Sequence, residues 1–153
     1  MLNNLEVKIV EETVKEFFDR MGFEVDIKVN DFDDKTLPIE LTTEDPKILI
    51  GEGGRTLAEA QHILKALLVK KLKTVFFVNL DINEYKKKKY QYLRESARVA
   101  ADEVALSKKE KSLSPMGPAE RRVVHLELAE RKDVFSESIG QEPERKIIIK
   151  PSV

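Results

Sequence analysis

The chain has 153 residues, of which 41% are apolar and 36% are charged, so it can form one domain or two small domains with a heavily charged surface. It has no cysteine, no apolar run of membrane-spanning length and an acidic N-terminus, which argue against disulfides, thiolate metal sites, membrane spans and a signal peptide, and favour a cytoplasmic protein. The net charge of -1 combines 7 Lys and Arg against 15 Asp and Glu in residues 1–60 with 20 against 13 in residues 61–153, so we expect the second part to attract a polyanion.

The first part of the chain begins with helical periodicity up to Gly22, which we expect to cap the helix at its C-terminus. Alternating apolar and polar residues then predict strands at 23–29 and 37–43. We expect the second strand at the edge of a sheet, because Pro38 lacks the N–H group that a ladder hydrogen bond needs. The apolar face of the helix carries Val10, Val14, Phe17, Phe18 and Met21.

A short helix is predicted to begin at residues 45–46, where an aspartate cap precedes a first-turn proline, and to end at Gly51. A longer amphipathic helix follows the glycines, and Thr56 and Glu59 have the spacing of a capping box at its start. The nearly continuous apolar run at 74–80 predicts a strand. The predicted order is helix, strand, strand, short helix, glycine loop, helix, strand.

A second unit is predicted to begin near Asn83 with a long helix, because apolar residues recur there at steps of three and four. A strand at 112–116 and a helix from Pro118 to about residue 132 are expected next. The last two strands, at 133–140 and 145–151, have the pattern of a hairpin. The apolar positions of the long helix are Tyr90, Leu93, Ala97, Ala100 and Val104.

Gly51, Glu52, Gly53 and Gly54 form a Gly-x-x-Gly turn between two predicted helices, and Arg55 follows it. Such a turn can present unpaired N–H groups to a phosphate, and a Cβ would keep a sugar-phosphate away from the backbone. Taken alone, the pattern favours a turn without a ligand. The element order around it resembles a type II KH domain, whose GxxG loop clamps the backbone of about four single-stranded nucleotides. The glycine patterns of a P-loop and of a dinucleotide fold are absent.

Arg121 and His125 lie four residues apart on a predicted helix, next to Arg122, and we expect them to flank the apolar row Val124–Leu128 without belonging to it. Arg suits bidentate contact with phosphate, and His can donate to phosphate or stack on a base. On spacing alone, the simpler interpretation pairs Arg121 with a nearby carboxylate and makes His125 a hydrogen-bonded helix residue. The long helix, the "SLSPM" segment, the "ERRVVH" helix and the closing hairpin together resemble an R-three-H domain, a family that binds single-stranded nucleic acid.

Lys86, Lys87, Lys88 and Lys89 form a basic run at the junction of the two predicted units. A lysine run is often only solvated, but this position favours a general attraction for a phosphate backbone. Exposed tyrosines beside the run can stack on bases, although the apolar position of Tyr90 also suits a core residue. The tyrosines around the run are Tyr85, Tyr90 and Tyr92.

No catalytic site is predicted. His62, Glu59 and Glu52 are not accompanied by a Cys nucleophile, a Ser in a nucleophile elbow or a His pair at metal-ligand spacing. We therefore expect no enzyme activity, no cofactor and no metal site.

The succession of the two segments over nearly the whole chain resembles the Jag family of bacterial RNA-binding proteins. The resemblance implies an α+β protein with a type II KH-like domain in residues 1–82 and an R-three-H domain in residues 83–153. It implies binding of single-stranded RNA, a role as a post-transcriptional regulator or RNA chaperone linked to cell elongation and division, and partnership with a small single-KH-domain protein; we also consider a homodimer. Many family members carry a further N-terminal Jag domain without a counterpart here, and family loops commonly have basic residues where Glu52 and Gly53 stand.

In this interpretation the loop Gly51–Gly54, the N-terminus of the next helix and Arg55 hold the RNA backbone. Arg121, Arg122 and His125 form a second contact, and the lysine run supplies general attraction. Two alternatives stay open: a protein-interaction module whose acidic first half docks a protein, and a protein that prefers single-stranded DNA.

Overall fold

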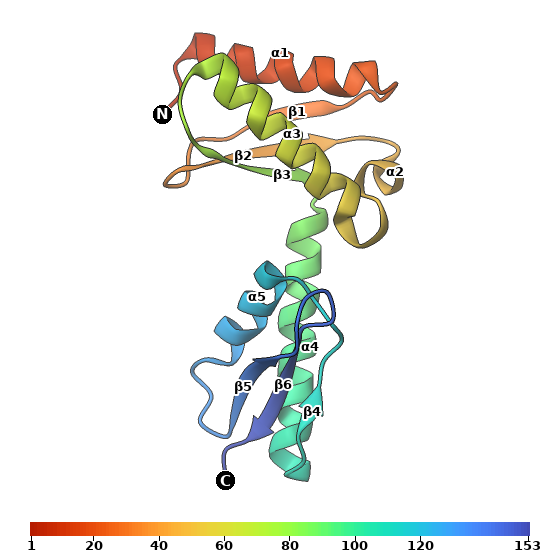
Figure 1. Ribbon diagram of the computed structural model, residues 1–153, viewed down its shortest axis with the longest axis vertical. Helices are drawn as coiled ribbons and strands as arrows, with labels where there is room; N and C mark the ends of the chain where they lie inside the picture. Colours follow the sequence, from red (N-terminus) through yellow and green to blue (C-terminus); the bar gives the residue numbers. More distant parts are fainter. The chain divides into compact units, whose positions relative to one another are not determined.

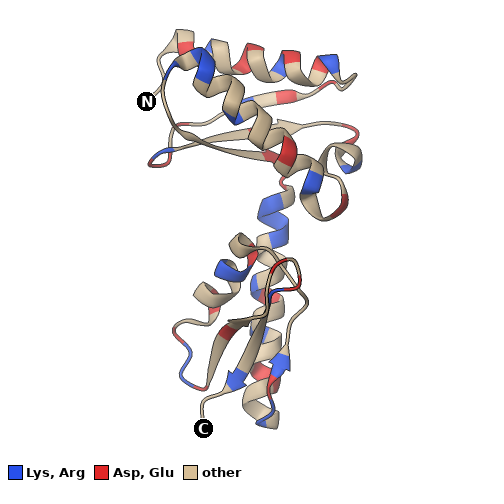
Figure 2. Ribbon diagram, viewed as in Figure 1, with Lys and Arg blue, Asp and Glu red and all other residues tan.

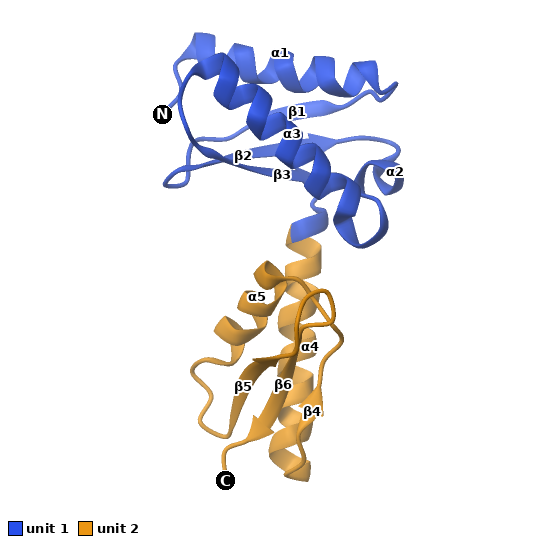
Figure 3. Cartoon of the chain, in the orientation of Figure 1, with its two compact units in different colours: residues 1–86 blue, residues 87–153 orange.

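The computed structural model describes residues 1–153 as two compact units, residues 1–86 and 87–153 (Figure 3). Both units combine helices with a three-stranded sheet, which confirms the predicted α+β class. The boundary expected between residues 82 and 83 stays a prediction about domains, since the compact units are defined by contacts alone. None of the helices combines the length and the apolar character that crossing a membrane requires.

Unit 1 has the element order expected from the sequence (Figure 1). Its sheet has the strand order β1-β2-β3, in which β1 is antiparallel to β2 and β2 is parallel to β3. The elements are α1 (Asn4–Arg20), β1 (Asp26–Val29), β2 (Thr36–Thr42), α2 (Pro46–Ile50), a 3-10 turn (Glu52–Gly54), α3 (Arg55–Leu72) and β3 (Phe77–Ile82).

Both ends of α1 are closed by capping motifs. At the N-terminus the Asn3 side chain accepts from the Glu6 N–H at 2.9 Å, and the Glu6 carboxylate accepts from the Asn3 N–H at 2.9 Å. At the C-terminus Gly22 has φ +85°, and the Phe23 N–H reaches back to the Phe18 carbonyl at 3.0 Å. The predicted cap at Gly22 is therefore confirmed, and glycine is needed there for the left-handed backbone. Met21 lies beyond the last helical residue and is 43% exposed, so it does not share the apolar face.

The edge position predicted for Pro38 is wrong, because β2 is the central strand of its sheet. In an antiparallel pair, the N–H and C=O of one residue point to the same neighbour. The Pro38 carbonyl accepts from the Asn30 N–H at 3.0 Å, so the missing proline N–H also faces Asn30. Asn30 follows the last residue of β1, and the bond that proline cannot make therefore lies beyond the end of the ladder.

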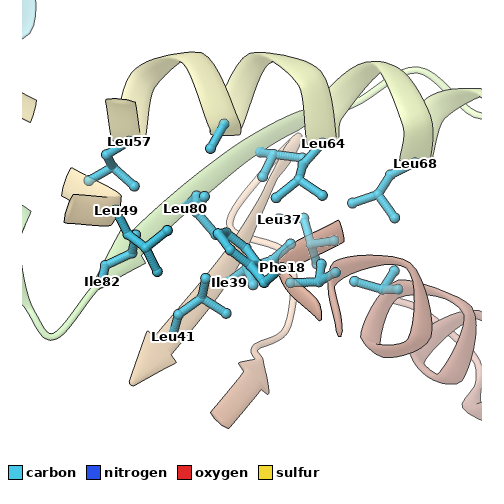
Figure 4. Close-up of a cluster of buried hydrophobic side chains, with 14 of the residues drawn as sticks. Phe18, Leu37, Ile39, Leu41, Leu49, Leu57, Leu64, Leu68, Leu80 and Ile82 are labelled. Carbon is cyan, nitrogen blue, oxygen red and sulfur yellow. The ribbon is translucent and has the colours of Figure 1, made fainter. Parts of the chain in front are cut away.

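The core of unit 1 lies between the sheet and the layer formed by α1 and α3 (Figure 4). Each helix contributes residues at three- and four-residue steps, and the strands contribute alternate residues, as expected for one buried face per element. The fully buried side chains of this core include Val10, Val14, Phe18, Leu37, Ile39, Leu49, Leu57, Leu64, Leu68, Leu80 and Ile82.

The start of α3 differs from the predicted capping box. The N-cap is Gly54, no side chain caps the helix, and Thr56 already lies inside its first turn. A Cβ on Gly51 would lie 2.2 Å from the Thr56 Oγ1 atom, so the Thr56 side chain packs against the glycine loop. At the other end, Lys73 has φ +55°, and the chain turns before β3 begins at Phe77 instead of residue 74.

The sheet of unit 2 is antiparallel and has the strand order β4-β6-β5, so β6 is its central strand. Helix α4 begins with the last two residues of unit 1 and continues through unit 2. The hairpin β5–β6 is confirmed. The elements are α4 (Tyr85–Ser107), β4 (Lys111–Ser112), α5 (Pro118–Leu128), β5 (Val134–Ile139) and β6 (Lys146–Pro151), and the core consists of Ala97, Ala100, Ala101, Val104, Val124, Leu128, Val134, Ile147 and Ile149.

Two predicted elements of unit 2 are too long. Of the strand expected at 112–116, only Ser112 lies in β4. The N–H groups of Leu113 and Met116 still donate to the carbonyls of Ile147 and Arg145, at 2.8 and 3.2 Å. Pro115 interrupts the ladder because it has no donor. Helix α5 ends at Leu128, because the Arg131 N–H bonds the Leu128 carbonyl in a tighter turn.

A substitution in the core of unit 1 should separate buried from exposed apolar residues. Leu80 is fully buried, so Leu80→Ala should lower the free energy of unfolding by about 2–5 kcal/mol. Val75 is 84% exposed, and Val75→Ala should change it by less than about 0.5 kcal/mol. Urea unfolding followed by circular dichroism measures both values. Equal losses for the two variants would contradict this packing.

Candidate nucleic-acid interface

The glycine loop of unit 1 is a demanding turn. Gly51, Gly53 and Gly54 all have positive φ, of +74°, +63° and +83°. A Cβ on Gly51 would collide with Thr56, and a Cβ on Gly54 would lie 3.1 Å from the Cε1 atom of Tyr85. Around Gly53 no atom would lie within 4 Å of a Cβ, so this position faces open space. Two of the glycines are therefore explained by packing, whereas Gly53 is required only by its backbone angle.

The loop leads directly into the N-terminus of α3. The first N–H groups of a helix have no acceptors within it, and no side chain caps α3. Glu52, Gly53 and Arg55 are exposed beside this helix end. The helix dipole and the N–H donors together favour an anion here, while the Glu52 carboxylate opposes one.

Unit 2 has a second, basic site that we call the Arg121 hollow. It gathers residues of α5 with residues of β5 and of the segment before β6, so it brings the predicted Arg121, Arg122 and His125 together. Figure 2 shows the basic residues of α5 on the ribbon. The residues that line the hollow are Pro118, Arg121, Arg122, His125, Leu126, Ser138 and Arg145.

Arg121 is buried, contrary to the prediction that it flanks the apolar row of α5. Steps of three and four residues place it on the same face as Val124 and Leu128, which are both buried. Its Nη1 atom donates to the Met116 carbonyl at 2.7 Å and forms an ion pair with Glu142 at 2.7 Å. These partners make burial of the guanidinium tolerable.

His125 is held between two serine hydroxyls of β5. Its Nδ1 atom lies 2.7 Å from the Ser136 Oγ atom, and its Nε2 atom lies 2.8 Å from the Ser138 Oγ atom. Burial, and secondly the charge of Arg121, hold the pKa of His125 below its ordinary value of 6.5. The imidazole is therefore neutral at pH 7 and acts as a positioned hydrogen-bonding group. His125 is thus hydrogen-bonded, as in the simpler interpretation, whereas the carboxylate paired with Arg121 is that of Glu142, in the connection between β5 and β6, and not a local one.

Lys86 is engaged within unit 1. Its Nζ atom donates to the Gln61 Oε1 atom at 2.6 Å and to the Asn79 Oδ1 atom at 2.9 Å. Gln61 Oε1 also accepts from the Leu80 N–H at 3.0 Å, on the outer edge of β3. Burial lowers the pKa of Lys86, and the nearby Asp81 carboxylate opposes this shift. Lys86 therefore behaves as a structural residue of the sheet edge more than as a solvated cation.

The other lysines of the run differ from one another. Lys89 forms an ion pair with Glu120 at 2.6 Å, and both side chains are more than two-thirds covered. Lys87 and Lys88 are exposed at the beginning of α4, where the basic residues follow one another along the helix (Figure 2). Among the tyrosines around the run, Tyr92 is 68% exposed. Of the four lysines of the run, only Lys87 and Lys88 are therefore exposed.

The sequence interpretation missed four residues of the Arg121 hollow and its surroundings. Ser136 and Ser138 alternate along β5, a pattern that already places them on one face. Arg145 precedes β6, its Nη1 atom lies 3.4 Å from the Gly140 carbonyl, and its Nε atom is buried without a hydrogen-bond partner. Glu142 lies in the connection between the strands, and no local sequence signal links it to Arg121.

The lowered pKa of His125 has a measurable consequence. The folded protein binds the His125 proton less tightly than the unfolded chain does. The neutral imidazole therefore contributes to the stability of the fold above pH 6.5, and this contribution is lost as the pH falls through the folded-state pKa. A nuclear magnetic resonance titration should give a midpoint for His125 below 6.5. His125→Gln should reduce the loss of stability of unit 2 on acidification. A midpoint at or above the ordinary value would contradict the burial described here.

The comparisons with known proteins agree with this geometry. Residues 91–151 match the R-three-H domain family, which confirms the resemblance noted for the second unit. Proteins named "RNA-binding protein KhpB" are similar to the chain: one from Clostridium symbiosum is 34% identical over 139 residues, which cover 90% of this chain and 63% of that protein. One from Streptococcus pneumoniae is 25% identical over 136 residues (89% and 41%), and one from Lactiplantibacillus plantarum is 29% identical over 129 residues (84% and 40%).

The chain thus spans less than two-thirds of the length of these curated relatives. The similarity nevertheless extends over most of the chain itself, across both compact units. This agreement and the R-three-H domain together support the resemblance to the Jag family, to which proteins named KhpB belong.

Proposed function

We propose that the chain binds single-stranded RNA. The observation that carries this proposal is the Arg121 hollow, where three arginines and a neutral histidine converge. Guanidinium groups are suited to phosphate, and a histidine whose two ring nitrogens are held by serine hydroxyls can offer its ring face to a base. The names of the relatives support RNA as the polyanion.

The glycine loop is proposed as a second contact, in a unit that we interpret as a KH-like domain. The uncapped N-terminus of α3, the exposed Gly53 and the exposed Arg55 support a contact with the sugar-phosphate backbone. Glu52 weakens this contact, because its carboxylate repels phosphate. Lys87 and Lys88 add attraction without sequence preference.

The proposed biological setting follows from the family. We infer a cytoplasmic, non-enzymatic RNA-binding protein that acts in post-transcriptional regulation or as an RNA chaperone, linked to cell elongation and division. A small protein with a single KH domain, or a second copy of this chain, is the proposed protein partner. Pull-down of tagged chain from bacterial cells with and without ribonuclease distinguishes direct protein partners from those bridged by RNA.

Matched RNA and DNA oligomers provide the main test, and an exposed arginine of the hollow is the variant of choice. Arg122→Ala should weaken RNA binding by about 1–3 kcal/mol and lower the slope of log affinity against log salt by about 1. Arg122 is exposed, so the fold should be unaffected. Arg94→Ala, which removes an exposed arginine of α4 outside the hollow, is the control.

Equal effects of the two arginine variants would remove the hollow from the RNA interface. Tighter binding of DNA would favour the single-stranded DNA alternative. Absence of binding to either oligomer would favour the protein-interaction alternative.

The glycine loop has a matched pair of variants at Gly53. Asn and Asp both tolerate positive φ, have nearly the same size and would meet no neighbouring atom at this position. If the loop approaches RNA phosphate, Gly53→Asp should weaken binding more than Gly53→Asn, by about 1 kcal/mol at low salt and less at high salt. Filter binding at two salt concentrations measures the difference. Indistinguishable variants would mean that the loop is only a turn.

A further inference from the structure

The ion pair between Arg121 and Glu142 joins a fixed cation to an exchangeable anion. The Arg121 side chain is only 10% exposed, whereas that of Glu142 is 52% exposed. Arg121 is positioned by its place on α5 and by its bond to the Met116 carbonyl, so its position does not depend on Glu142. Glu142 lies in the connection between β5 and β6, from which its side chain can turn into solvent.

A buried guanidinium needs an anion. Leaving a buried charge without its partner is strongly unfavourable, so Arg121 must be neutralised whether or not a ligand is bound. Arg binds carboxylate and phosphate through the same planar array of donors. A phosphate that replaces the Glu142 carboxylate would therefore keep Arg121 paired.

The surroundings of Arg121 favour phosphate over carboxylate. Arg122 and Arg145 line the same hollow, and the buried Nε atom of Arg145 has no hydrogen-bond partner. Buried donors are normally bonded, so this donor marks an incomplete set of contacts. A terminal phosphate has three non-bridging oxygens, and a backbone phosphodiester has two non-bridging and two ester oxygens around a tetrahedral phosphorus, so one group can accept from more than one guanidinium.

We propose that Glu142 is an intramolecular ligand of a phosphate subsite, and that a phosphate group of single-stranded RNA displaces its carboxylate from Arg121. The inference rests on the proposed function and adds a residue that sets the affinity of the site. Two sources share this chemistry: a phosphodiester of the RNA backbone and the terminal phosphate of a 5′-phosphorylated RNA.

The test compares Glu142→Gln with Glu144→Gln, which removes the same charge from an exposed residue of the same connection, whereas the ion pair with Arg121 is made by Glu142. Affinity is measured by fluorescence anisotropy for a short oligouridylate with a 5′-phosphate and for one with a 5′-hydroxyl. Glu142→Gln should bind at least about fivefold more tightly than the wild type, because the RNA phosphate no longer has to displace a charged carboxylate from Arg121. Glu144→Gln should give only the smaller gain that follows from the change in net charge.

Glu142→Asp is the second variant, because it keeps the net charge and withdraws the carboxylate by one methylene group; it should also tighten binding. If Glu142→Gln lowers the melting temperature, the RNA affinity of Glu142→Asp decides whether the carboxylate competes with phosphate. A gain for both oligomers assigns the subsite to a backbone phosphodiester, and a gain limited to the 5′-phosphorylated oligomer assigns it to a terminal phosphate.

Glu142 variants that bind no more tightly than Glu144→Gln, while Arg122→Ala still weakens binding, would overturn the inference and leave the proposed function intact. A wild-type chain that binds neither oligomer would remove both.

Discussion

The packing of α3 against the sheet of unit 1 is the interaction on which the glycine loop depends. Leu57, Leu64 and Leu68 are all buried, and burial of a leucine side chain contributes about 1.5–3 kcal/mol. Leu57 lies in the first turn of α3, so the helix is fixed from the residue at which its N–H donors become available. The contact between Gly51 and Thr56 then sets the direction of the loop. The burial that stabilises unit 1 therefore also aims the uncapped helix end, without any side chain assigned to that task.

Unit 2 uses the same principle with a different result. The buried face of α4 is built largely from alanines, which allow close packing, and α5 contributes Val124 and Leu128 to the same core. Because Arg121 belongs to that face of α5, the core itself holds the guanidinium in place. Arg122, one residue further, is exposed. One turn of helix thus supplies a buried cation and an exposed one, a combination that suits a site in which the buried contact positions a ligand and the exposed one adds attraction.

Hydrophobic periodicity, together with cap and glycine signals, predicted the order of elements in unit 1 and the hairpin of unit 2, because each element buries one face and its period records that face. It failed where tertiary pairing decides. Pro38 looked like an edge residue because the sequence does not tell where β1 ends.

The candidate site could be predicted only in part. One helix carries Arg121, Arg122 and His125, so their spacing in the sequence already brings them to the same hollow. Arg145 and Glu142 reach it only through the pairing of β5 with β6, which no local pattern encodes. Lys86 and Lys89 illustrate the same limit, since a run of identical residues does not reveal which lysine side chains become covered after folding.

The bond between Gln61 and the Leu80 N–H has a consequence for association between molecules. β3 is an outer strand, and such strands ordinarily offer a row of free donors and acceptors to any extended chain. Here Leu80 donates to a side chain of α3, and the next outward donor, that of Ile82, bonds the Asp81 carboxylate at 2.9 Å. An incoming strand would have to break both bonds and displace the Lys86 ammonium group from Gln61 before it could pair. This border of the sheet is therefore protected against strand addition, and aggregation through β3 is disfavoured in a protein whose opposite outer strand, β1, has only four residues.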